Sequence, residues 1–102
     1  MGIQHTVVFS LFHPRESPQA LAFLKDARAL LGSIPGVQQF AIHRQVSEKS
    51  ELTHQFSMMF ADEAAYRRYN EHEVHVSFVR DRWIPEVAEF QEYDFVDAGL
   101  SS

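Results

Sequence analysis

Hydrophobic side chains alternate with other residues in four separate stretches of this sequence, and this alternation restricts the possible folds more than any other feature. In residues 3–12, every second position forms one largely apolar row: Ile3, His5, Val7, Phe9 and Leu11. A period of two is typical of a β-strand with one face toward a core. Residues 37–46, 52–61 and 90–96 show the same pattern, the last of them weakly. The sequence therefore predicts four strands.

Two segments with helical periodicity separate these strands. The first opens at the Ser17-Pro18 pair, a hydroxyl cap followed by a proline in the first turn, and closes at Gly32, which we expect in a left-handed conformation. The second opens at Asp62, another capping residue, and resumes after a bend over residues 72–83. The order β-α-β-β-α-β predicts a ferredoxin-like α+β fold, with a four-stranded antiparallel sheet and helices on one face.

Length and charge restrict the domain organisation and the partners. We expect residues 1–97 to form a single domain and residues 98–102 to form a mobile tail. The formal net charge of −5 disfavours nucleic acid and anionic membranes as partners. No stretch approaches the roughly 20 apolar residues that span a bilayer, and the chain does not begin with a signal peptide. We therefore expect a cytoplasmic protein.

The alternating strands leave a second row of side chains on the far face of the predicted sheet. This row carries Val8, Phe12, Ala41 and Met59 among polar residues. A small domain leaves much of its surface exposed, and a half-apolar face is commonly closed by a partner. We therefore predict a two-fold homodimer formed through the open sheet face.

Side chains that can bind or transfer protons gather around the predicted bend. Tyr69, His72 and His75 are spaced by three, so that they share a face on helical turns. His5 and His54 lie in the apolar rows of their strands and are expected to face the interior. A histidine can accept a proton near neutral pH, and a tyrosine can donate to a carbonyl oxygen. The same residues could instead be core-edge groups that bond to each other or to the backbone.

The sequence predicts no cofactor and no metal ion. The chain has no cysteine and no glycine-rich phosphate loop. His5, His54, His72 and His75 could ligate a metal by residue type. However, residues 71–75 lack the His-Glu-x-x-His spacing of zinc proteases.

The sequence contains three short motifs in this order: a histidine in the first strand, the Ile-Pro-Gly-Val turn at residues 34–37, and Tyr-x-x-His-x-x-His-Val at residues 69–76. Together they resemble the stress-responsive A/B barrel family, the Dabb domain. The resemblance covers residues 3–97. It implies a ferredoxin-like fold whose sheets pair into a dimeric α+β barrel.

The resemblance also implies a chemistry. Some plant members are polyketide cyclases, in which the tyrosine and the last histidine of the motif act in catalysis; these match Tyr69 and His75. If the chain is an enzyme, the resemblance implies a cyclase or lyase with His75 as general base and Tyr69 as hydrogen-bond donor. Glu73 stands where the family often has proline, which affects the bend and the aim of His72. A small apolar carbonyl or phenolic compound is expected to contact five residues: His5, Phe23, His54, Phe56 and His72.

Two other functions stay open, because most members of the family have no assigned reaction. A non-catalytic stress or ligand-binding homodimer would bind its ligand without turnover. Haem-degrading monooxygenases share the barrel, but their Asn-Trp-His set is not visible here. His5 stands on the first strand, and Trp83 is the only tryptophan.

Overall fold

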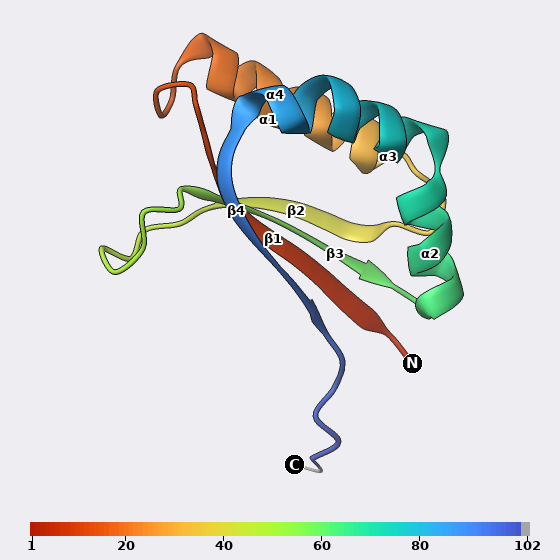
Figure 1. The fold of residues 1–102 in the computed structure, drawn as a ribbon. Coiled ribbons are helices and arrows are strands. Elements are labelled where there is room, and N and C mark those ends of the chain that lie inside the picture. The colour runs from red at the N-terminus through yellow and green to blue at the C-terminus, as the bar shows by residue number, and fades with distance from the viewer. Residues whose placement is uncertain (101–102) are drawn as a thin grey trace.

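The computed structural model describes residues 1–100 and has the predicted ferredoxin-like architecture (Figure 1). Four strands form one antiparallel sheet in the order β2-β3-β1-β4. They are β1 (Ile3–Leu11), β2 (Gln38–Arg44), β3 (His54–Phe60) and β4 (Val87–Phe95). Strand β4 therefore begins earlier than the weak alternation predicted. The last two residues of the predicted tail, 101–102, lie outside the described residues.

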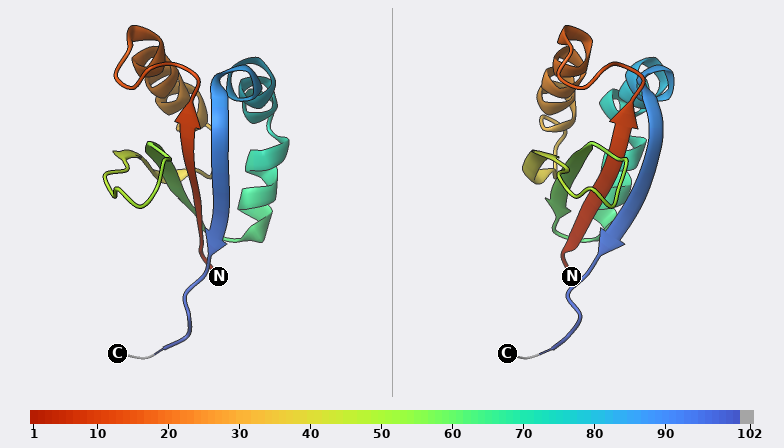
Figure 2. Two further views of the ribbon diagram at one scale, coloured as in Figure 1. Left: turned by 60° about the vertical axis from the view of Figure 1, so that its left-hand side comes forward. Right: turned by 90° about the vertical axis from the view of Figure 1, so that its left-hand side faces the viewer.

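All of the helices in this part of the chain lie on one face of the sheet (Figures 1 and 2). Helix α1 (Pro18–Leu31) connects β1 to β2. A longer connection from β3 to β4 contains α2 (Glu63–Glu71), α3 (Glu73–Phe78), the π-helical turn η1 (Val79–Trp83) and α4 (Ile84–Glu86). No helix within residues 1–100 is long and apolar enough to cross a membrane.

The helix starts follow the capping chemistry that the sequence predicts, whereas one helix end does not. Ser17 Oγ accepts a hydrogen bond from the Ala20 N–H at 3.2 Å, and Asp62 Oδ1 accepts from the Ala65 N–H at 2.8 Å. Each cap satisfies a backbone donor that lacks a partner within its helix. Gly32 has a right-handed backbone (φ −66°), so the predicted left-handed closing position was wrong.

Aromatic side chains fill the layer between sheet and helices. Strand β3 alternates strictly between buried and half-buried residues. The rings of Phe9 and Phe56 lie 4.6 Å apart, and the ring of Phe23 on α1 packs 5.9 Å from Phe9. Burial of one such side chain stabilises a fold by about 1.5–3 kcal/mol. Five large side chains are almost fully buried and form the centre of this layer: Phe9, Phe23, Phe56, Met58 and Phe60.

The other face of the sheet carries no helix in this part of the chain (Figure 1). Val8, Ala41 and Met59 are partly exposed, and Phe12, just beyond β1, is exposed. In the strand register, Tyr93 pairs with Thr6 and Phe95 pairs with Gln4, so β4 adds two exposed aromatic rings to this face. The second face therefore mixes apolar and polar groups, as the alternation indicates.

Candidate functional site

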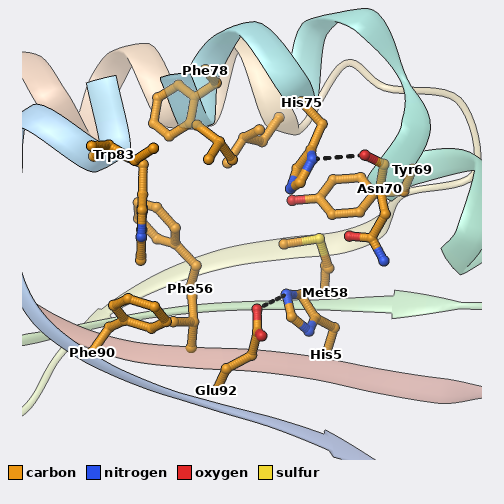
Figure 3. Close-up of a pocket in the computed structure, with 14 residues that line it drawn as sticks. His5, Phe56, Met58, Tyr69, Asn70, His75, Phe78, Trp83, Phe90 and Glu92 are labelled. Carbon is orange, nitrogen blue, oxygen red and sulfur yellow. Dashed lines mark hydrogen bonds and ion pairs between the residues drawn. The ribbon is translucent and has the colours of Figure 1, made fainter. Parts of the chain in front are cut away.

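A cavity of about 420 Å³ lies between the inner face of the sheet and the connection from α2 to α4 (Figure 3). Its wall is mostly apolar, and polar side chains gather toward one end. The polar lining residues are His5, Tyr69, Asn70, His75 and Glu92. The apolar lining residues are Val7, Leu31, Phe56, Met58, Phe78, Val79, Trp83, Ile84 and Phe90.

A sharp turn between α2 and α3 brings Tyr69 and His75 together. His72 has an extended backbone (ψ 139°), which ends α2, and its Nδ1 accepts a hydrogen bond from the Val74 N–H at 3.1 Å, which caps α3. The ring centroids of Tyr69 and His75 are consequently 4.5 Å apart. The predicted bend is therefore present, and His72 forms it as a cap rather than as part of the cavity wall.

One ring nitrogen of His75 is hydrogen-bonded to the backbone. Its Nδ1 lies 3.1 Å from the carbonyl oxygen of Asn70. A carbonyl oxygen only accepts, so the neutral ring carries its proton on Nδ1 and a free lone pair on Nε2. Burial lowers the pKa of His75; the hydrogen bond to Asn70 opposes this shift and the nearby His5 adds to it. At neutral pH, Nε2 is therefore available to accept a proton.

Tyr69 supplies the complementary donor. Its side chain is buried, with 2% of the residue surface exposed. Burial raises the pKa of Tyr69, and the nearby Tyr66 and Glu92 raise it further. The phenol stays protonated at neutral pH and can donate to an oxygen that gains negative charge. A neutral imidazole thus lies beside a protonated phenol at the polar end of the cavity.

His5 reaches the same end of the cavity from β1 and belongs to a hydrogen-bonded cluster. Its Nδ1 lies 2.7 Å from Asp94 Oδ1 and 2.9 Å from the Tyr66 hydroxyl. The Tyr66 hydroxyl also donates to Asp94, with distances of 2.9 Å to Oδ1 and 3.0 Å to Oδ2. Burial and Asp94 raise the pKa of Tyr66. His5 Nε2 lies 3.6 Å from Glu92 Oε2, and the His5 ring is 6.3 Å from Tyr69.

The π-helical turn contributes to the apolar end of the cavity. The Ile84 N–H bonds to the carbonyl of Val79, five residues earlier. Such a turn differs from an α-helix by one extra residue, and single π turns are frequent at functional sites. Two pairs of residues spaced by five consequently line the same wall: Phe78 with Trp83, and Val79 with Ile84. Nothing in the helical spacing of residues 72–83 predicted this turn.

Two other predicted site residues lie outside the cavity. His54 pairs with Phe9 at the opposite end of the sheet, stacks on its ring at 5.9 Å, and has Nδ1 2.8 Å from Thr53 Oγ1. Phe23 is fully buried in the core, where its ring stacks on Phe56 at 6.2 Å. The structure therefore brings four of the predicted site residues to the cavity: His5, Phe56, Tyr69 and His75.

Several residues of this region were not predicted as site residues, among them Tyr66, Asn70, Trp83, Glu92 and Asp94. Glu92 and Asp94 follow Phe90 at spacings of two, so all three lie on the same face of β4, and the register sets Asp94 directly opposite His5. That register cannot be inferred from a weak alternation. Tyr66 precedes Tyr69 by three, so the helical spacing that grouped the other residues could have included it.

Comparison with known families and structures identifies the chain. The stress responsive A/B barrel domain, Dabb, matches residues 3–97. The chain belongs to the Dabb family. It is 52% identical to a Dabb protein with a ferredoxin-like fold from Mesorhizobium loti, with a TM-score of 0.95, 96% of this chain covered and 98% of the other. No curated protein matches the sequence.

More distant solved structures share the Dabb fold. A dimeric ferredoxin-like protein of unknown function from Thermobifida fusca is 20% identical, with a TM-score of 0.76 and coverage of 93% of this chain and 90% of the other. The hydroxynitrile lyase of Passiflora edulis is 12% identical, with a TM-score of 0.82 and coverage of 99% and 97%. At these identities the likeness establishes the fold alone.

Proposed function

We propose that the cavity binds a small, largely apolar carbonyl or phenolic compound and that His75 and Tyr69 transfer its protons. One observation carries this proposal: the His75 ring, with Nδ1 held by the Asn70 carbonyl, lies 4.5 Å from the buried Tyr69 ring at one end of a mostly apolar cavity. A base and a donor side by side are what removal of a proton next to a carbonyl requires.

The two ends of the cavity suggest how such a compound lies. The reacting carbonyl belongs at the polar end, next to Tyr69 and His75 (Figure 3). The aromatic or aliphatic remainder lies against Phe56, Trp83 and Phe90 toward the other end. The volume of about 420 Å³ falls within the range of about 300–1,000 Å³ that is usual for small-molecule pockets.

The proposed proton transfer balances without any added reagent. His75 Nε2 takes a proton from the acidic carbon, and the electron pair moves onto the carbonyl oxygen. The Tyr69 hydroxyl donates a hydrogen bond to that oxygen as its charge grows. His75 then returns the proton to the carbon, or to the oxygen of a second carbonyl that the carbanion has attacked. The first outcome is exchange, and the second is an aldol-type closure of the cyclase or lyase kind.

The related structures support two parts of this proposal. A protein with the same fold is a hydroxynitrile lyase, so this fold is compatible with lyase chemistry. The Thermobifida fusca relative is described as dimeric, and the sheet face with Tyr93 and Phe95 gives this chain an apolar surface for a second copy. We therefore include a homodimer in the proposal. Sedimentation velocity tests it, and a monomer at micromolar concentration would contradict it.

Proton exchange on a simple β-diketone tests the chemistry. The probe is 1-phenylbutane-1,3-dione, whose acidic CH₂ and phenyl ring match the two ends of the cavity. In D₂O, wild-type protein should accelerate loss of the CH₂ proton signal in NMR spectra. His75→Gln should lower kcat by about 10²–10⁴-fold, as is usual for loss of a general base. Tyr69→Phe, which keeps the ring and removes the hydroxyl, should lower kcat by about 10²-fold.

Two results would contradict the proposed chemistry. Exchange at the buffer rate would leave binding without turnover, the behaviour of a non-catalytic ligand-binding protein. Equal rates for wild type and His75→Gln would show that another residue is the base.

The haem alternative has less support, because Asn70 and Trp83 both line the cavity but lie toward its opposite ends (Figure 3). A haem titration without a shift of the absorption band is the expected result.

A further inference from the structure

The hydrogen-bonded cluster around His5 is not needed for the proton transfer proposed for Tyr69 and His75. We propose that Asp94 and Tyr66 are positioning residues that hold His5 as a second proton-transfer group of the cavity. The atom of His5 that accepts and donates the proton is Nε2. The inference rests on the proposed function, because a second group is useful only if protons move in the cavity. It also makes a claim about the His5 tautomer that can be measured without any substrate.

The hydrogen bonds around His5 determine which nitrogen carries the proton. An ionised Asp94 only accepts, and its Oδ1 receives His5 Nδ1 at 2.7 Å and the Tyr66 hydroxyl at 2.9 Å. The Tyr66 hydroxyl donates its proton to the Asp94 carboxylate. The short contact between Asp94 Oδ1 and His5 Nδ1 therefore needs a proton on Nδ1, because the carboxylate has none to donate. In the neutral ring Nε2 is then the lone-pair atom, and it faces Glu92 and the cavity.

The geometry indicates that Tyr66 restrains Asp94. The Asp94 side chain is 45% exposed, so its carboxylate could turn into solvent if nothing held it. The Tyr66 hydroxyl contacts both carboxylate oxygens, at 2.9 and 3.0 Å. The Tyr66 ring is itself fixed by stacking on Phe60 at 5.0 Å. A chain of contacts thus runs from the core through Tyr66 and Asp94 to the His5 ring.

The position of His5 suggests a division of labour with His75. Both histidines flank Tyr69, whose ring is 6.3 Å from His5 and 4.5 Å from His75. When His75 Nε2 removes the carbon proton, the lone pair of His5 Nε2 takes up a proton from water and passes it to the substrate oxygen, which leaves His5 neutral again. The product differs from the substrate by one proton moved from carbon to oxygen. His75 then gives its extra proton to the hydroxide that is left, which returns both histidines to their neutral forms.

The experiment combines a spectroscopic and a kinetic readout. Long-range ¹H–¹⁵N NMR spectra of ¹⁵N-labelled protein report the tautomer of the His5 ring in wild type and in Asp94→Ala. The wild type should carry the proton on Nδ1. In Asp94→Ala, the Tyr66 hydroxyl has His5 Nδ1 as its remaining partner and should donate to it, which moves the His5 proton to Nε2.

The kinetic readout uses the same β-diketone and a matched control. Asp94→Ala should lower kcat about tenfold, a modest share of what acid–base groups supply, with KM nearly unchanged. Asp97→Ala removes a carboxylate from the same end of the chain, where its Oδ1 accepts only from the Gly99 N–H among the described contacts. It should leave both the tautomer and kcat as in wild type. Circular dichroism spectra and unfolding midpoints show whether each variant is folded.

Each remaining result counts against the inference in a recognisable way. A wild-type His5 with its proton on Nε2, or an Asp94→Ala variant with an unchanged tautomer, would overturn the positioning role. A changed tautomer with kcat equal to that of Asp97→Ala would overturn the role of His5 in proton transfer. Wild-type exchange at the buffer rate would refute the proposed function and the catalytic use of His5, while the tautomer would still decide the positioning.

Discussion

His5 and His54 occupy equivalent places in the sequence pattern but have different surroundings in the fold. Each sits in the apolar row of a strand, and they are 5% and 6% exposed. His5 lies among Asp94, Glu92 and Tyr66 on the cavity wall. His54 lies at the other end of the sheet, and Arg15 and Arg44 are the charged groups that act on it.

The difference shows what strand alternation can and cannot predict. Alternation fixes the face on which a side chain lies, and both histidines are on the inner face. The end at which each lies depends on register, and β1 and β3 run antiparallel, with His5 opposite Met58 and His54 opposite Phe9. The two histidines are therefore four residues apart along the strands, although both belong to the buried row.

Replacing the two histidines in the same way gives the largest expected contrast. His5→Gln should lower kcat for β-diketone exchange by about 10²-fold, because it removes a proton-transfer group. His54→Gln should stay within about twofold of wild type, because His54 is not part of the cavity wall. Rates are compared at equal concentrations of folded protein. A large loss in His54→Gln alone would reverse the assignment of the two ends.

Stability should show the opposite contrast between His54 and the cavity histidine His75. His54→Ala removes a buried ring that stacks on Phe9 and bonds to Thr53, and should reduce the free energy of unfolding by about 1–3 kcal/mol. His75→Ala should cost less than about 1 kcal/mol, because a site residue is retained for function rather than for stability. Urea titrations at one protein concentration measure both values. A greater loss for His75 would favour a structural role for the Tyr69–His75 pair.

The pH dependence of stability should reflect both ends of the sheet. Burial lowers the pKa of His54 from its usual 6.5, and Arg15 and Arg44 lower it further; burial also lowers the pKa of His75. As the pH falls below about 6.5, the unfolded chain therefore binds protons that the native state does not. The free energy of unfolding should decrease over that range, and His54→Gln should make the decrease shallower. An unchanged slope in His54→Gln would show that His54 titrates alike in both states.

The smallest effect is expected from the ion pair at the His54 end. Arg44 Nη1 lies 2.9 Å from Glu16 Oε1, and both side chains are more than half exposed. Exposed pairs of this kind contribute about 0–1 kcal/mol. Glu16→Gln should therefore change the free energy of unfolding by less than about 0.5 kcal/mol in urea titrations. A change above 1 kcal/mol would mean that this end has a structural role beyond His54 itself.

Much of the fold could be predicted because it depends on local patterns. The strand and helix order follows from periodicity, and the capping roles of Ser17 and Asp62 follow from side-chain chemistry. The pairing of Tyr69 with His75 was within reach for the same reason, since both lie on consecutive helical turns joined by the His72 bend.

The rest of the site could not be predicted because it depends on long-range register. Asp94 meets His5 across strands that lie 89 residues apart in the sequence. Trp83 lies in a π turn, which shifts the helical phase by one residue. His54 was assigned to the site because the alternation predicts the face of the sheet on which it lies but not the end of the sheet. Residue type and periodicity alone do not contain these three facts.

A ligand titration followed on the histidine rings tests the central claim most directly. Acetophenone, an apolar ketone with a single carbonyl group, is added to ¹⁵N-labelled protein while the ring signals of all six histidines are recorded. If the cavity is the site, the signals of His5 and His75 should move together and saturate, and that of His54 should stay in place. Saturable movement of His54 without His5 and His75 would contradict the account.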